Sequence, residues 1–155
     1  MVSSRDEVYR KFGETAEAAQ LLETELGTLL LAQEAAREDL FVNENPERAA
    51  ELLSQINAHT LGKLLKLLKP NITSIDELEA LLLKALAERN RLSHSFYRQH
   101  NVRINSEEGR ALMLQDLESV HVTVWDAYKA VMLVSGIDLD AVAEQVAKSS
   151  NHNGP

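Results

Sequence analysis

A stripe of apolar residues between residues 74 and 98 is the pattern that most restricts the fold of this chain. At about 100° per residue, one helix face collects five apolar side chains, those of Leu78, Leu82, Ala85, Leu92 and Phe96. Arg89 lies in the middle of this stripe, and Asn90 and His94 lie one turn apart on its flank. The pattern predicts an amphipathic helix whose buried face contains a cation. Such a cation needs an anionic partner, a wet cavity or another subunit.

The composition favours an all-helical protein. Of the 155 residues, 45% are hydrophobic but only 5% are aromatic, and there are three prolines. Leu, Ala and Glu are abundant, and these residues favour helices over strands. A chain of this length suits one domain. We therefore expect a single helical domain over residues 1–148 and a disordered tail over residues 149–155.

Capping and breaking signals divide the chain into four long helices and a short fifth one. Ser, Asn or Asp precedes each apolar pattern, and Gly, Pro or polar loops follow it. The expected helices cover about residues 4–39, 46–69, 74–98, 107–135 and 139–148. Because the connecting loops are short, we expect an all-α, up-and-down four-helix bundle with the fifth, C-terminal helix as an appendage.

Charge and residue usage exclude several classes of function. The net charge of -8 argues against a general nucleic-acid coat protein. Residues 84–110, however, contain six Lys or Arg against three acids, so this window carries +3 while the remainder carries -11. The absence of cysteine excludes a disulfide framework and a thiolate metal site. No apolar run approaches the roughly 18 residues of a membrane span, so we expect a cytoplasmic protein without membrane partners.

The segment Arg89-Asn90-x-x-x-His94 resembles the motif of the HEPN superfamily, the domain named for higher eukaryotes and prokaryotes and nucleotide binding. In that family an arginine, often followed by asparagine, precedes a histidine by four to six residues inside an all-helical domain. The resemblance covers most of the chain as architecture and one short motif as residues. It implies a bundle that dimerises and brings two motifs together. It also implies a metal-independent endoribonuclease, frequently the toxin of a toxin–antitoxin pair, although other members are inactive and serve binding roles.

The resemblance assigns a role to each motif residue. His94 would act as general acid or base at the ribose 2'-hydroxyl or the leaving oxygen. Arg89 would stabilise charge on the phosphate, and Asn90 would orient the histidine or a phosphate oxygen. No metal or cofactor is implied. The expected partners are a second copy of the chain, an RNA substrate and a cognate antitoxin protein.

Helix geometry independently favours a site made from two copies. Arg89 and His94 are five residues apart, so they project about 140° from each other on one helix. A single copy therefore cannot easily aim both side chains at one phosphate. We also expect five nearby residues to contact substrate, although the arginines could form only a solvated face and the tyrosine could simply pack: Arg91, Tyr97, Arg98, Arg103 and Arg110.

Structural interpretations compete with each of these assignments. Arg89 could form an ion pair with an acid on another helix, such as Glu25, Glu38 or Asp116, and His94 could be an ordinary packed or surface histidine. Glu118-x-x-His121 is half of a di-iron signature, but the sequence contains no second copy, so we interpret His121 as a core or interface residue. The alternative function is a non-catalytic helical module whose apolar arc binds a partner helix.

Overall fold

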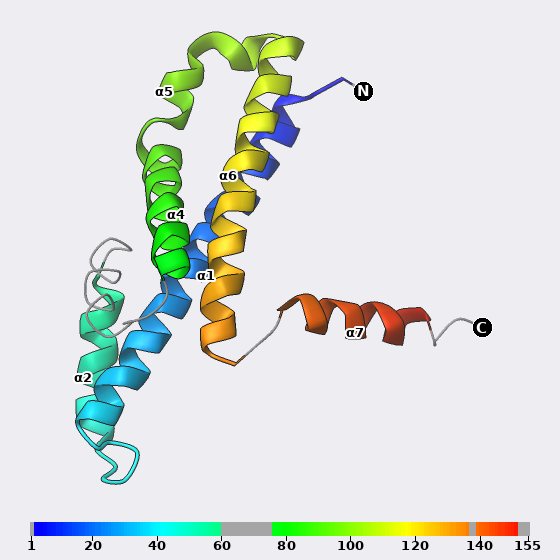
Figure 1. The fold of residues 1–155 in the computed structure, drawn as a ribbon. Coiled ribbons are helices and arrows are strands. Elements are labelled where there is room, and N and C mark those ends of the chain that lie inside the picture. The colour runs from blue at the N-terminus through cyan, green and yellow to red at the C-terminus, as the bar shows by residue number, and fades with distance from the viewer. Residues whose placement is uncertain (1, 60–75, 137–138, 152–155) are drawn as a thin grey trace.

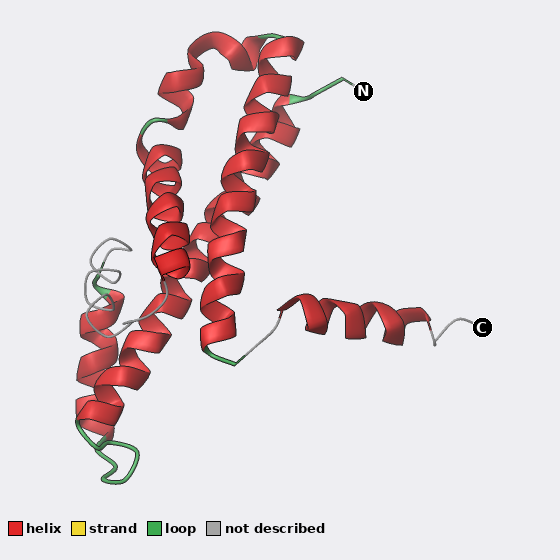
Figure 2. Cartoon of the chain, in the orientation of Figure 1, coloured by secondary structure: helices red, strands yellow, loops and turns green. Residues whose placement is uncertain are grey.

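The computed structural model describes residues 2–59, 76–136 and 139–151, and within these ranges the chain is helical with no strand (Figures 1 and 2). The all-helical prediction is therefore confirmed. The segment η2 (Asn101–Asn105) is a 3₁₀ helix. The α-helices are α1 (Arg5–Arg37), α2 (Pro46–Asn57), α4 (Asp76–His94), α5 (Phe96–His100), α6 (Glu107–Val134) and α7 (Leu139–Asn151).

Three helices begin at the caps that the sequence predicts. Ser4 accepts a hydrogen bond from the amide of Glu7, whose carboxylate accepts one from the amide of Ser4, which completes a capping box. The side chain of Asn45 caps α2, where Pro46 occupies the first turn, and Ser106 caps α6. The expected cap at residue 74 and the expected end of the second helix at residues 69–71 lie outside the described residues.

The helix expected to continue to about residue 98 is interrupted at Ser95. This residue leaves the helical conformation at φ -140° and ψ -5°, and its hydroxyl donates to the carbonyl oxygen of Arg91 at 3.2 Å. Asn101 then adopts a positive φ of 50°, which asparagine tolerates better than most residues. The interruption lets α5 and η2 turn the chain back into α6 (Figure 1).

α1 and α6 run side by side in the same direction. Near their starts the hydroxyl of Ser3 donates to the carbonyl oxygen of Glu107 at 3.0 Å. Near the end of α6 the hydroxyl of Ser135 donates to Glu25 at 2.9 Å. The residue numbers of the bonded partners increase together along α1 and α6, so the two helices are parallel. The up-and-down order expected from the sequence would make the first and fourth long helices antiparallel.

α2 and α4 both run antiparallel to α1, at different parts of its length. The rings of Phe12 and Phe96 are 5.7 Å apart, whereas Glu23 bonds to Arg89, so α4 pairs with the N-terminal part of α1. α2 covers the C-terminal part (Figure 1), where Ile56 lies against Gly27. α2 and α4 therefore run in the same direction as each other, whereas an up-and-down order alternates the directions of successive helices.

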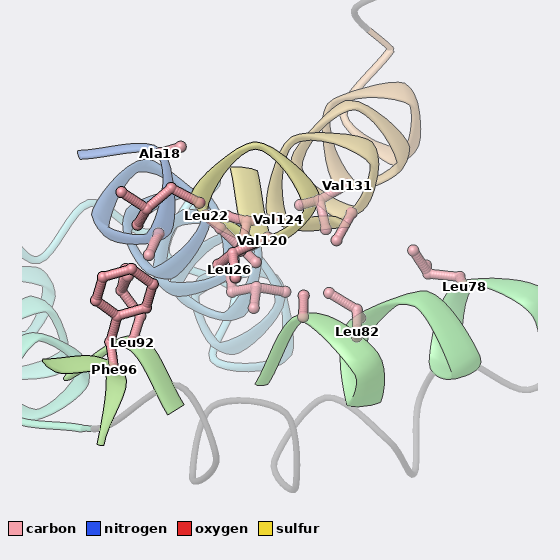
Figure 3. Packing of buried hydrophobic residues seen from close by; sticks show 14 of the residues in the cluster. Ala18, Leu22, Leu26, Leu78, Leu82, Leu92, Phe96, Val120, Val124 and Val131 are labelled. Carbon is pink, nitrogen blue, oxygen red and sulfur yellow. The ribbon is translucent and has the colours of Figure 1, made fainter. Parts of the chain in front are cut away.

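The core lies where α1, α4 and α6 meet (Figure 3). All five residues of the predicted apolar stripe are buried, four of them on α4 and the fifth, Phe96, at the start of α5. On α6 the apolar side chains from Leu117 to Val131 at helical spacing are buried, whereas Val134 at the helix end is exposed. Within the described residues no buried side-chain nitrogen or oxygen lacks a hydrogen-bond partner. The residues that α1 and α6 contribute include Ala18, Leu22, Leu26, Val120, Val124 and Val131.

α7 extends away from the other helices (Figure 1). Its residues 140–150 are all exposed, including Val142 and Val146. The helix runs to Asn151, past the end expected at Lys148. None of the helices in the described ranges is long and apolar enough to cross a membrane.

Two glycine substitutions should have opposite effects on stability. A Cβ added at Gly109 would lie 2.0 Å from the carbonyl oxygen of Arg103, so Gly109→Ala must displace η2 and should cost about 1 to 3 kcal/mol. A Cβ added at Gly13 meets nothing within 4 Å, so Gly13→Ala should stabilise α1 by about 1 kcal/mol. Urea denaturation of both variants measures the difference. Equal midpoints would contradict the close approach of η2 to α6.

Candidate functional site

Arg89 is held by one contact to α1 and one to its own helix. Its Nε donates to Oε1 of Glu23 at 2.7 Å, and its Nη1 donates to Oδ1 of Asn90 at 3.2 Å. The side chains of Arg89 and Glu23 are each 24% exposed, so the pair is partly withdrawn from water. The cation in the apolar stripe therefore has the anionic partner that its position requires.

The three acids that the sequence analysis named for Arg89 have other partners. Glu25 accepts from Ser135, Glu38 accepts two hydrogen bonds from Arg48, and Asp116 accepts from Arg91. The ion pair proposed as the structural interpretation of Arg89 is thus present, but its carboxylate is that of Glu23. The sequence contains no local signal for this choice, because the two residues are far apart in the chain.

His94 is the last residue of α4, and its side chain is exposed. Its imidazole makes no hydrogen bond to any residue in the described ranges, whereas its carbonyl oxygen accepts from Nη2 of Arg98 at 2.9 Å. Asn90, one turn earlier, is also exposed. The structure therefore brings Arg89 and Asn90 into contact, and it leaves His94 open to solvent without a hydrogen bond to either.

The expected substrate-contacting residues differ widely in their surroundings. Tyr97 is 39% exposed and packs its ring 5.2 Å from that of Phe12, and partial burial raises the pKa of its hydroxyl. Arg110 is bound to main-chain oxygens of Ser3 and Ile104 at 2.5 and 3.1 Å. Arg98 is exposed, with its guanidinium on the end of α4. Tyr97 and Arg98 thus follow His94 within four residues and remain accessible.

Arg91 and Arg103 belong to a polar network that we call the Asp116 cluster, comprising Glu88, Arg91, Gln99, His100, Arg103 and Asp116. Asp116 accepts from Nη1 and Nη2 of Arg91 at 2.8 and 2.7 Å. Arg91 also bonds to Glu88 and Gln99. The sequence left a solvated face as one alternative for Arg91, but this paired geometry turns the side chain toward α6 and leaves it half-buried.

His100 lies between two members of the Asp116 cluster. The ring is only 5% exposed, with Nε2 at 2.6 Å from Oδ2 of Asp116 and Nδ1 at 3.2 Å from Nη1 of Arg103. Its imidazole thus connects the carboxylate on α6 to the guanidinium on η2. The cluster joins α4, α5, η2 and α6 immediately after His94.

Glu118 and His121, which form half of a di-iron signature, both lie against Lys11. Glu118 forms a salt bridge with Lys11, and Nζ of Lys11 lies 3.3 Å from Nδ1 of His121. The Lys11 ammonium lowers the pKa of the Glu118 carboxyl. In the part of the chain that the structure describes, no group of three or more His, Cys, Asp or Glu could hold a metal ion. Trp125 packs with its ring 5.2 Å from Tyr128, as expected of a packing residue.

A small polar pocket lies between α1 and the end of α2, where Gly27 allows the two helices to approach. Its volume is about 220 Å³. Glu23 lines it and also bonds to Arg89, so the pocket and the motif share one carboxylate. We call this the polar pocket, and its lining residues are Gln20, Glu23, Thr24, Gly27, Ile56, Asn57 and His59. None of them carried a functional signal in the sequence.

No protein-family model, curated protein or solved structure to which this chain was compared matches it.

Asp116→Asn should weaken the fold and remove part of its acid sensitivity. Hydrogen bonds from Arg91 hold the pKa of the Asp116 carboxyl below its ordinary 3.8. A lowered folded-state pKa means that the stabilisation is present above pH 3.8 and is lost as pH falls through the folded value. Losing charged hydrogen bonds should cost about 2 to 3 kcal/mol at pH 7. Urea midpoints at pH 7 and below pH 4 measure both effects.

The matched control is Asp126→Asn, because Asp126 is half exposed and has only a long contact with Lys129. This variant should change stability by less than about 1 kcal/mol at either pH. If the two asparagine variants behave alike, the Asp116 cluster does not hold the turn together.

Proposed function

We propose that this chain is a metal-independent endoribonuclease that works as a homodimer, with Arg89, Asn90 and His94 as its site. The observation that carries the proposal is the exposed imidazole of His94, which has no hydrogen-bond partner among the described residues and lies on the same helix as a guanidinium of fixed orientation. A proton-transfer group has to be open to its substrate, whereas a charge-stabilising group has to be held in place.

His94 supplies the proton transfers of the proposed reaction. One imidazole takes the proton of the ribose 2'-hydroxyl, and the 2'-oxygen then forms a bond to phosphorus. The bond from phosphorus to the 5'-oxygen breaks, and that oxygen receives a proton from an imidazole. The products are a 2',3'-cyclic phosphate and a 5'-hydroxyl. Histidine suits both steps because its ordinary pKa lies near 6.5.

Arg89 is prepared for a phosphate by the two contacts that hold it. Glu23 fixes Nε and Asn90 fixes Nη1, while Nη2 makes no hydrogen bond to any described residue. A donor that is already oriented stabilises developing charge without first reorganising. In this proposal Asn90 therefore orients the arginine, and Tyr97 and Arg98 extend the contact surface beyond His94. A cognate protein that covers the same face would serve as the antitoxin.

The second candidate function is a non-catalytic interaction module. Leu83, on the α4 flank that contains Asn90 and His94, is 49% exposed, and Tyr97 of α5 is 39% exposed. An apolar flank of this kind fits a partner helix. Under this alternative, Arg89→Ala and His94→Ala would change complex formation while no ribonuclease activity appears in the wild type.

Cleavage of single-stranded or transfer RNA in the presence of a chelator tests the first proposal. The wild type should leave 2',3'-cyclic phosphate ends, and His94→Ala should slow cleavage by roughly 10² to 10⁴-fold. Arg89→Ala should slow it by roughly 10² to 10³-fold. The control Arg37→Ala removes an arginine that is exposed at the end of α1 and should leave the rate unchanged.

Identical RNA patterns from the wild type and His94→Ala would refute the enzymatic proposal. A toxin should also slow the growth of cells that express it, and either motif substitution should relieve that effect.

Mixing two inactive variants tests whether the site is shared between two copies. If Arg89 of one protomer works with His94 of the other, a mixed dimer of Arg89→Ala and His94→Ala retains one intact site. About half of the dimers in an equal mixture are mixed, so about a quarter of the wild-type rate should return. The measurement is cleavage after joint refolding or co-expression, with dimer formation followed by sedimentation. No recovery in a confirmed mixed dimer would place the site within one copy.

A further inference from the structure

We propose that the polar pocket between α1 and α2 binds a nucleobase of the RNA, with a preference for the bases that carry an exocyclic amino group, adenine, cytosine and guanine, over uracil. This inference rests on the proposed ribonuclease function, because it assigns to the polar pocket the base next to the phosphate that Arg89 would hold.

The size of the polar pocket fits a single aromatic heterocycle. Its volume is about 220 Å³, whereas a cavity of about 150 Å³ in a protein interior holds a benzene molecule. Gly27 lines the pocket, and a Cβ added there would lie 3.1 Å from Cγ2 of Ile56. The absence of a side chain at Gly27 therefore lets α2 lie close to α1.

The lining of the polar pocket is rich in groups that both donate and accept. Gln20 comes from α1 and Asn57 from the end of α2, and neither carboxamide makes a hydrogen bond to a described residue. The imidazole of His59 is likewise without a partner among the described residues and is half-buried. Carboxamides pair with the donor and acceptor edge of a base, and imidazoles stack on unpaired bases in RNA recognition.

The charge in the polar pocket favours a neutral ligand over a phosphate. Glu23 places a carboxylate in its wall, and this carboxylate is balanced by Arg89 through the 2.7 Å contact. An anion inside the pocket would face Glu23. Arg89 does not belong to the lining, and its Nη2 makes no hydrogen bond to a described residue, so it can bind an anion outside the pocket. A nucleotide can satisfy both demands, with its base in the pocket and its phosphate on the guanidinium.

The same carboxylate sets the expected base preference. Carboxylates accept hydrogen bonds from exocyclic amino groups, as they do from N4 of cytosine, and carboxamides pair with N6 and N7 of adenine. Uracil presents carbonyl oxygens in place of an amino group, and these would face the oxygens of Glu23. Guanine carries an exocyclic amino group at N2 as well. Adenine, cytosine and guanine therefore complement the wall of the polar pocket better than uracil does.

Binding of nucleoside 3'-monophosphates to the full-length His94→Ala protein tests the inference without turnover. The four nucleotides are titrated separately by calorimetry or by nuclear magnetic resonance. The adenosine, cytidine and guanosine nucleotides should each bind more tightly than the uridine nucleotide. Adding Gln20→Ala or Asn57→Ala should weaken that binding by about fivefold to a hundredfold. Both residues are on the surface, so these changes should leave the unfolding midpoint unchanged.

Glu23→Gln provides a readout that a purely structural role would not change. It replaces an acceptor by a group that also donates, so the preference between adenosine and uridine nucleotides should shift toward uridine. The matched control is Gln145→Ala, which removes an exposed glutamine on α7. Failure of all four nucleotides to bind, or binding that Gln20→Ala and Asn57→Ala leave unchanged, would overturn the inference.

The outcome is separable from that of the proposed function. Nucleotide binding that depends on Gln20 and Asn57, in a protein that never cleaves RNA, would keep the polar pocket as a base site and discard the nuclease. RNA cleavage that depends on His94 while the pocket substitutions change neither affinity nor base preference would do the reverse.

Discussion

The packing of α1 along α6 in a common direction is the constraint on which the rest of the structure depends. Both helices bury continuous apolar faces, so the remaining elements must fit around the pair (Figure 3). α4 fills the third side of the core and runs the opposite way, which brings Arg89 opposite Glu23. α1 also continues beyond this core and offers its last turns to α2. The polar pocket lies on the part of α1 where the contact with α4 ends and the contact with α2 begins.

Local signals in the sequence predicted where long helices begin and which α4 face is buried, but not the directions in which the helices pack. Ser4, Asn45 and Ser106 begin helices where capping chemistry predicts, and the apolar stripe on α4 is buried as its periodicity requires. The interruption at Ser95 carried no such signal, because serine is tolerated within helices and the neighbouring residues keep the helical spacing. The parallel packing of α1 and α6 could not be read from the sequence, since direction depends on contacts between distant segments.

The sequence likewise predicted only some features of the candidate site. An arginine within an apolar stripe implied a partner of opposite charge, and the structure supplies one. Its identity was hidden because the chain has 24 acidic residues and no periodicity favours Glu23 among them. The sequence left a solvated face open for Arg91 for a related reason, since only the approach of α6 brings Asp116 within reach. His100 and the polar pocket are likewise products of tertiary contact between ordinary residues.

The adjacent N-termini of α1 and α6 offset part of the negative charge at this end of the molecule. Each helix start carries roughly half a positive charge from its unpaired main-chain amides, and the two starts are joined through Ser3 and Glu107. Asp6 and Glu7 lie in one first turn, and Glu107 and Glu108 lie in the other. These four acids are therefore partly neutralised by the main chain itself. A polyanion approaching this end of the molecule meets a weaker repulsion than the formal charge of -8 implies.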